Sequence, residues 1–348
     1  MLDIPYLDDM EVVENSLHYL SKEYPMKATF TLTPAESRRL IAKAVVQMPE
    51  VKAALEKAYV ILAGGTTNAF IYQELLGRSV EPARHTAGTV TNGVLCVTNV
   101  ADRAPFPTIL YKGQVVDKTI RQALDDFHRE TVIIKGANAV DPEGNVGIIT
   151  SGFDGGTVAA TIGTVSSQGL KYIVPVGLEK LIPSVKDAVQ VTGAKTLDYC
   201  IGSDFGMYCL VNALVVTEIQ ALKLLCDVEA RQVAAGGIGG CEGAVVLVIM
   251  GAEPAVRAAI ALIESIKGEP AIAGLKGTCS TCRYVPVCRD ARRGLAGVAA
   301  GLKDDMSCIE VRDVLSGTGD SRTAGRREPC PRARTAGCPG PGAGDSPA

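Results

Sequence analysis

Residues 132–183 constrain the fold of this chain more than any other stretch, because two short apolar runs bracket two Gly-rich polar turns. Residues 131–135 and 171–176 are rich in Ile and Val and are bounded by Gly or Pro, which is typical of buried strands. A helical pattern over residues 157–168 lies between them. Strands that alternate with helices predict an α/β fold with a mostly parallel sheet, whose ligands bind beyond the carboxyl ends of the strands.

Composition places the chain among globular proteins. Its 348 residues suggest one large or two modest domains, and 47% hydrophobic residues against 21% charged residues suit a sizeable core. The formal net charge of −3 gives no electrostatic reason to expect nucleic acid or a membrane surface as partner. The acidic start lacks an apolar export signal, and no apolar run approaches the ~18 residues of a spanning helix. We therefore expect a cytoplasmic protein.

Several local signals predict where elements begin and end. Thr33, with Pro34 at the first helical position and Glu36 three residues after Thr33, predicts a capped helix start. Gly77 can end a helix that covers residues 69–76. Asn92 and the glycine after it indicate a hairpin, although the same turn could line a ligand cleft.

A glycine-rich loop is the first candidate ligand site. It follows a predicted strand at residues 58–62 and precedes a helix. Glycines let the backbone approach a ligand, and free N–H groups at a helix start favour negative charge. The alternative is a tight turn with a threonine as N-cap. The residues expected to contact an anionic small molecule are Gly64, Gly65, Thr66, Thr67 and Asn68.

Two further ligand contacts are expected beyond later strands. Asn138 leaves the strand at residues 131–135 and could orient a ligand or fix its own loop. Lys180 follows the strand at residues 171–176 and could neutralise a bound phosphate or carboxylate. The alternative for Lys180 is a solvent-facing residue at the start of a short helix.

Acidic residues in the same stretch are weak candidates for catalysis. Glu143 could act as a base or nucleophile, but its neighbours are those of a surface turn. Asp154 could instead cap the following helix. Asp141 and Asn145 are typical of an Asx turn, so we interpret both as structural.

A second unit is predicted for residues 205–275. Its strand–helix–strand–helix order suits a small ferredoxin-like α+β module, which could regulate the protein or form a homo-oligomer. The predicted elements are a strand at 207–217, a helix at 218–235, a Gly-rich turn at 236–243, a strand at 244–251 and a helix at 254–267.

Three cysteines fall within ten residues of the segment 276–315. Cys279, Cys282 and Cys288 have a spacing that suits an iron–sulfur cluster or a zinc ion, and free thiols are the alternative. A fourth ligand would have to come from farther along the chain. Residues 316–348 contain no Leu, Ile, Val, Met or aromatic residue, so we expect a disordered tail or the product of a shifted reading frame.

Three motifs resemble one superfamily, that of ribose-5-phosphate isomerase, glucosamine-6-phosphate deaminase and CoA-transferases. They are ILAGGTTNAFIYQELLG at 61–77, KGANAVDPEGNVGI at 135–148 and VPVGLEKLIP at 174–183. Within the superfamily, the lactate-utilisation (LUD) domain is the most similar, over residues 33–200. The resemblance implies a Rossmann-like, three-layer α/β domain at 1–204 that binds a phosphorylated or CoA-like ligand.

The departures from that superfamily limit what it implies about chemistry. Ribose-5-phosphate isomerases carry an Asp-Gly-Ala-Asp-Glu motif, whereas this chain has Lys-Gly-Ala-Asn-Ala at 135–139. No counterpart of the CoA-transferase nucleophilic glutamate is evident. LUD proteins are linked to organic-acid oxidation beside iron–sulfur partners. We therefore expect a protein that binds a phosphorylated, CoA-linked or organic-acid metabolite, as an enzyme or enzyme subunit. A ligand-sensing protein and an iron–sulfur accessory protein are the alternatives.

Overall fold

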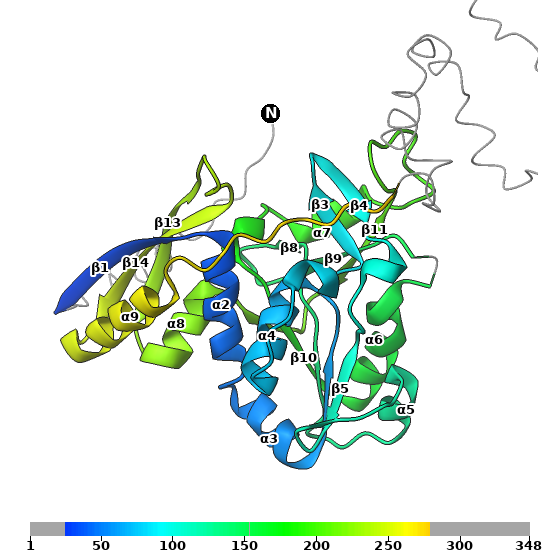
Figure 1. The fold of residues 1–348 in the computed structure, drawn as a ribbon, viewed down its shortest axis with the longest axis horizontal. Coiled ribbons are helices and arrows are strands. Elements are labelled where there is room, and N and C mark those ends of the chain that lie inside the picture. The colour runs from blue at the N-terminus through cyan, green and yellow to red at the C-terminus, as the bar shows by residue number, and fades with distance from the viewer. Residues whose placement is uncertain (1–24, 153, 279–348) are drawn as a thin grey trace, which may run out of the picture.

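The computed structural model describes residues 25–152 and 154–278 (Figure 1). Its largest sheet has six strands, and four of them run parallel, as the sequence predicts for the strands around residues 131–135 and 171–176. The other two form an antiparallel edge, so the sheet is mixed. In spatial order the strands are β12 (Leu214–Val216), β10 (Lys171–Pro175), β7 (Val132–Ile134), β2 (Tyr59–Leu62), β5 (Thr108–Tyr111) and β6 (Gln114–Val115).

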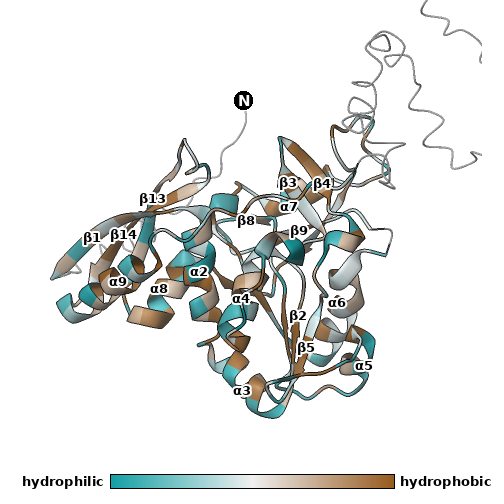
Figure 2. Ribbon diagram, viewed as in Figure 1, coloured by the Kyte–Doolittle hydropathy of each residue, from teal (hydrophilic) through white to brown (hydrophobic). Residues whose placement is uncertain are grey.

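Both faces of this sheet are buried. Alternate residues of a strand point to opposite faces, so Val60 of β2 joins one hydrophobic cluster and Ile61 joins another. Figure 2 shows β2 and β5 as strongly hydrophobic strands inside the molecule. The cluster around Val60 receives α2 (Pro34–Val45), α3 (Pro49–Lys57) and α4 (Thr66–Leu76). The cluster around Ile61 receives α5 (Ile120–Asp125) and α6 (Gly156–Gln168).

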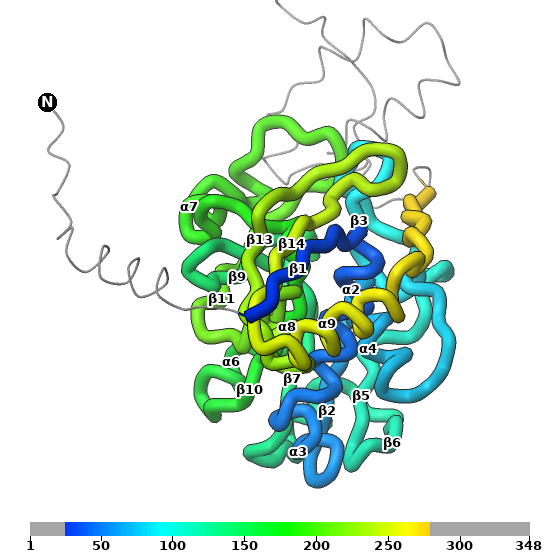
Figure 3. Tube along the Cα trace, turned by 90° about the vertical axis from the view of Figure 1, so that its left-hand side faces the viewer, coloured from blue at the N-terminus to red at the C-terminus, as the bar shows by residue number. Residues whose placement is uncertain are grey.

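A separate three-stranded antiparallel sheet joins the two ends of the described chain. Its order is β1 (Met26–Leu32), β14 (Ala244–Gly251) and β13 (Glu229–Gly236). The helices α8 (Glu218–Cys226) and α9 (Glu253–Ile266) pack on it, and Figure 3 looks onto this part of the molecule. Leu247 of β14 and Leu40 of α2 belong to the same hydrophobic cluster, so one core continues between the two sheets.

Two sequence predictions in this region are wrong. The helix predicted for residues 218–235 ends at Cys226, because Asp227 takes a left-handed conformation with φ of 54°, and residues 229–236 form β13. The strand predicted for residues 207–217 is two strands, β11 (Gly206–Leu210) and β12. They pair with β9 (Val146–Thr150) and β10, which precede the predicted boundary at residue 204. The sheet partners of β14 are instead β1 and β13.

Smaller elements complete the described chain. β11, β9 and β8 (Ala139–Val140) form an antiparallel sheet beside α7 (Val185–Gln190). β3 (Gly88–Thr91) and β4 (Val94–Val97) form the hairpin that Asn92 indicates, with positive φ at Asn92 and Gly93. Three short 3₁₀ turns are η1 (Pro82–His85), η2 (Val100–Asp102) and η3 (Leu178–Lys180).

The predicted helix ends agree with the structure. Thr33 and Glu36 form a reciprocal capping box at the start of α2, and Gly77 ends α4 in the left-handed conformation. No helix in the described ranges is long and apolar enough to cross a membrane.

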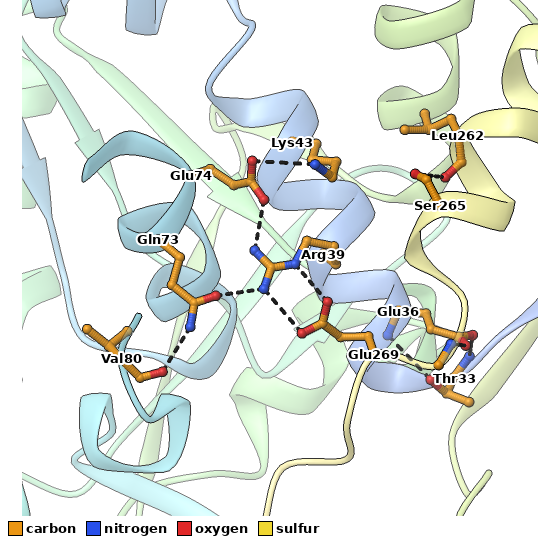
Figure 4. Close-up of polar contacts among 11 residues, drawn as sticks. Thr33, Glu36, Arg39, Lys43, Gln73, Glu74, Val80, Leu262, Ser265 and Glu269 are labelled. Carbon is orange, nitrogen blue, oxygen red and sulfur yellow. Dashed lines mark hydrogen bonds and ion pairs between the residues drawn. The ribbon is translucent and has the colours of Figure 1, made fainter. Parts of the chain in front are cut away.

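Arg39 links α2 to elements on both sides of it (Figure 4). Its guanidinium contacts Glu74 of α4 at 2.8 Å and Glu269, just after α9, at 2.9 Å. It also donates to Gln73 and lies over the ring of Phe70, 4.5 Å from the ring centroid. Because the side chain is largely buried, these charge-assisted contacts fix α2 between the two sheets more firmly than exposed ion pairs would.

The packing of Gly64 generates a testable prediction. A Cβ at this position would lie 2.7 Å from the ring of Phe106 and 3.0 Å from the carbonyl oxygen of His85. Gly64→Ala should therefore lower the free energy of unfolding by about 1–3 kcal/mol, measured by urea denaturation.

Gly163, in the interior of α6, is the matched control because a Cβ there meets no atom within 4 Å. Gly163→Ala should be neutral or stabilising, by up to about 1 kcal/mol, since alanine is the better helix former. Equal stability of the Gly64→Ala variant and the parent would show that Phe106 does not pack against this loop.

Candidate functional site

The candidate site lies at the carboxyl edge of the parallel strands. β2, β7, β10 and β12 run in the same direction in adjacent positions, so the segments that follow them emerge at one edge. The chain leaves β2 toward β5 on one side, and it leaves β7 toward β10 on the other. The strand order therefore reverses between β2 and β7, which is where open α/β sheets bind ligands.

The Gly64–Asn68 loop follows β2 and begins α4, as the sequence predicts. The N–H of Gly65 donates to the carbonyl oxygen of His85 at 2.6 Å. Gly65 has φ of +149°, a conformation that side-chain-bearing residues rarely adopt. Thr66 is partly exposed, whereas Thr67 is buried. The loop is thus held from outside by the segment that contains His85.

Asn68 joins the ends of two neighbouring strands. Its Nδ2 donates to the carbonyl oxygens of Ala63 at 2.8 Å and Ile134 at 3.1 Å, directly beyond β2 and β7. The side chain is 2% exposed, and its Oδ1 has no hydrogen-bond partner among the described residues. The amide nitrogen is therefore used structurally, and only the oxygen remains available to another group.

Two lysine amines lie at the same loop, beyond the carboxyl ends of β7 and β10. The Lys180 Nζ donates to the carbonyl oxygen of Ala137 at 3.0 Å, and the Lys135 Nζ donates to that of Gly136 at 3.3 Å. Since these carbonyls belong to successive residues, both amines lie at one loop. Within residues 25–152 and 154–278, neither amine forms an ion pair with a carboxylate.

The environment weakens proton binding at both amines. Burial and, as a smaller cause, the positive charge of Lys180 together lower the pKa of Lys135 to about 8. Burial also lowers the pKa of Lys180 to about 8, with a contribution from Arg38, while the negative charges of Glu179 and Glu218 oppose the change. Both side chains keep some exposed surface, so they remain accessible from solvent.

A buried carboxyl group lies beside Lys180. Glu218, the first residue of α8, is 0% exposed, and its Oε2 accepts a hydrogen bond from the N–H of Leu178 at 2.9 Å. Burial raises its pKa above the usual value, and the nearby charge of Glu179 adds to this, although the Ser37 hydroxyl and the Leu178 N–H act in the opposite direction. Glu179 is itself paired with Arg38 of α2 at 2.7 Å.

The acidic candidates from the sequence lie outside this cluster of charges. Glu143 is exposed and pairs with Lys186 at 2.6 Å, and the hydrogen bond from Lys186 lowers its pKa, which makes it a weaker base. Asp154 is exposed, and its Oδ1 accepts from the N–H of Gly156 at the start of α6. In this structure the contacts of both residues are those of a surface turn and a helix start.

Asn138 and Asp141 fix the loop that follows β7. The Oδ1 of Asn138 accepts from the N–H of Ile149 at 3.0 Å, although the side chain is largely exposed. Asp141 accepts hydrogen bonds from the N–H groups of Asn145 and Val185, each at 2.9 Å. The structural interpretation of Asp141 and Asn145 is confirmed, and Asn138 has the loop-fixing contact that was one of its two expected roles.

Sequence reasoning missed Lys135, Arg38 and Glu218 as site residues. Lys135 ends a predicted strand, and that position alone could have marked it as a neighbour of Lys180. Glu218 begins a helix in both the sequence prediction and the structure, but no local pattern separates a buried glutamate at a helix start from an exposed one. Cys279, Cys282 and Cys288 lie outside the described residues. The described residues themselves contain no group of three or more metal-binding side chains.

Comparison of the chain with protein-family models, with curated proteins and with solved structures finds no match. The candidate site is defined by its own geometry: two lysines without an ion-pair partner among the described residues, a helix start and a buried carboxyl group at adjacent strand ends.

The buried carboxyl of Glu218 predicts a pH-dependent effect of Glu218→Gln. Since the pKa of Glu218 in the folded chain is raised above the ordinary 4.5, the ionised form opposes folding above that raised pKa. Below pH 4.5 both folded and unfolded chains are protonated, and the effect vanishes. Glu218→Gln should thus raise the melting temperature by at least about 2 °C near pH 8 and by less at pH 4.

Glu143→Gln is the control, for which we expect the melting temperature to change in the opposite direction. Its pKa is lowered by Lys186, so the carboxylate contributes stability above pH 4.5 and loses it as the pH falls. Because this pair is exposed, the substitution should lower the melting temperature only slightly at pH 8. A loss of stability in Glu218→Gln that is the same at pH 4 and pH 8 would contradict the assigned pKa direction.

Proposed function

We propose that this chain binds a small anionic metabolite at the carboxyl edge of its parallel strands. The ligand is phosphorylated, CoA-linked or an organic acid, and the protein is an enzyme or enzyme subunit of organic-acid metabolism. One observation carries the proposal. The amines of Lys135 and Lys180 donate hydrogen bonds to the carbonyl oxygens of two successive residues, and neither amine forms an ion pair with a carboxylate in the described ranges.

The cost in folding free energy of placing two lysines close together supports an anionic ligand. Two neighbouring like charges that are partly removed from water oppose folding unless another group compensates them. Bound phosphate or carboxylate would supply that compensation and bring both pKa values back toward 10.5, the ordinary value. An arrangement that costs stability in the free protein and is relieved by a ligand is typical of functional sites.

The start of α4 strengthens the same site. Asn68 contacts the carbonyl oxygen of Ile134, the residue before Lys135, so the Gly64–Asn68 loop lies next to the lysine pair. The first backbone N–H groups of α4 and the helix dipole favour negative charge there. Thr66 and Thr67 carry the hydroxyl groups that could add hydrogen bonds to the same anion.

An enzymatic role is favoured by the position of Glu218, whose charge acts on Lys180 although the two groups form no ion pair in the described ranges. Burial shifts the pKa of the amine down and that of the carboxyl up, so both groups approach the pH range in which protons are exchanged. This supplies the acid–base groups that the exposed Glu143 and Asp154 do not.

We also propose a Rossmann-like domain and a ferredoxin-like module for this fold. Helices cover both faces of the six-stranded sheet, which supports a Rossmann-like domain of three layers. If β1 is counted before α8, then β1, α8, β13, β14 and α9 follow the strand–helix–strand–strand–helix order of a ferredoxin-like module.

Ligand sensing is a second candidate function, favoured by one contact between the site and the three-stranded sheet. Glu179 binds Arg38 through Oε1, and its Oε2 lies 3.2 Å from where a Cβ of Gly243 would be, at the turn between β13 and β14. A ligand that changes the charge of Lys180 would act on Glu179, and hence on this turn.

The test is a thermal-shift titration with inorganic phosphate, pyruvate and coenzyme A. At 100 times its dissociation constant, a ligand should stabilise the parent by about 2.7 kcal/mol. Lys135→Gln and Lys180→Gln should abolish most of that gain. Without ligand at pH 7, each variant should be as stable as the parent or more stable, on the order of 1 kcal/mol, because the substitution removes the repulsion.

Lys186→Gln is the matched control, since it makes the same charge change at an exposed lysine that pairs with Glu143. It should leave the response to ligand unchanged. A parent that responds to none of the three compounds, or variants at Lys135 and Lys180 that respond as the parent does, would contradict the proposal.

A further inference from the structure

We infer that Lys135 is a nucleophilic amine that forms an imine with the carbonyl group of an anionic aldehyde or 2-oxo acid, while Lys180 holds the negative charge of that ligand. The inference rests on the proposed anion site and names its substrate class. It follows from the unequal surroundings of two amines that lie at the same loop.

The charges around the two amines assign the roles. Among the described residues, the charged group that acts on the Lys135 amine is Lys180, and its positive charge favours the neutral form of Lys135. Lys180 instead lies among Arg38, Glu179 and Glu218, and the two carboxylates favour its charged form. The pKa of each amine is lowered to about 8, so the feature that separates their roles is the position of the carboxylates, two of which act on Lys180 and none of which, among the described residues, acts on Lys135.

The hydrogen bonds of the two amines agree with the assignment of Lys135 as the nucleophile and Lys180 as the anion-binding cation. The Lys180 Nζ is held at 3.0 Å by the carbonyl oxygen of Ala137, whereas the Lys135 Nζ has a longer contact of 3.3 Å with its neighbouring residue. A weakly held amine is free to present its lone pair to a ligand. A second cation beside a partly desolvated lysine is a known way to activate such an amine toward carbonyl compounds.

The covalent step needs no other reactant. The Lys135 nitrogen forms a bond to the carbonyl carbon, and the carbonyl oxygen takes up a proton from Lys180 to give a carbinolamine. Lys180 regains this proton from the nitrogen and gives a proton to the carbinolamine oxygen, the C–O bond breaks, and the oxygen leaves as water. The nitrogen then returns its second proton to Lys180, so an amine and a carbonyl compound yield an imine and water, and Lys180 ends in its starting charge state.

The test uses the full chain, glyoxylate and sodium cyanoborohydride at pH 7. Cyanoborohydride reduces an imine to a stable secondary amine, which peptide mass spectrometry locates. Lys186 and Lys223 are internal references, because both are exposed and ion-paired, with the pKa raised by hydrogen bonds to a carboxylate. Lys135 should be modified at least roughly tenfold faster than either reference, since a pKa near 8 leaves more neutral amine.

Lys180 is tested with two variants and a neutral aldehyde. Glyoxylate should modify Lys135 faster than acetaldehyde does, and Lys180→Gln should remove that preference. Lys180→Arg, which keeps the positive charge, should retain much of it and serves if the glutamine variant does not fold. Inorganic phosphate should slow the modification of Lys135 by glyoxylate.

Separate outcomes would overturn the inference and the anion site. If phosphate stabilises the parent through both lysines but glyoxylate modifies Lys135 no faster than Lys186, the imine is wrong and the anion site stands. Modification of Lys180 in place of Lys135 would also overturn the assignment. If phosphate has no effect and the two aldehydes modify Lys135 equally, the anion site itself is wrong.

Discussion

The parallel arrangement of β2, β7, β10 and β12 is the constraint on which the rest of the candidate site depends. It brings together segments that are distant in sequence, because every parallel strand ends at the same edge. Asn68 then fixes two of these ends with hydrogen bonds from one buried amide. The lysines that follow β7 and β10 are buried at this edge, and burial is the largest cause of the lowered pKa of each.

Much of the local structure could be predicted from the sequence. The buried strands, the helix at residues 157–168, the capping box at Thr33 and the hairpin at Asn92 are set by neighbouring residues, and the structure agrees with them. The Gly64–Asn68 loop and Lys180 were also expected at strand ends. Such features depend on short-range backbone preferences and on hydrophobic periodicity, which a single sequence displays.

The rest depends on contacts between distant segments. β13 contains Glu, Ala, Arg and Gln, which favour helices, yet it pairs with β14 and is a strand. β1 joins that sheet across more than two hundred residues, which no local pattern indicates. The pairing of Lys135 with Lys180 and the burial of Glu218 follow from strand order, so they appear only when the sheet is assembled.

NMR titration of the lysine side chains tests most directly whether Lys135 and Lys180, which have no ion-pair partner in the part of the chain that the structure describes, form an anion site. Chains labelled with ¹³C-lysine, with resonances assigned through Lys135→Gln and Lys180→Gln, would report the pKa of each amine. We expect both amines to titrate near 8 without an anion and toward 10.5 when inorganic phosphate is added. Two lysines that titrate near 10.5 in both conditions would contradict it.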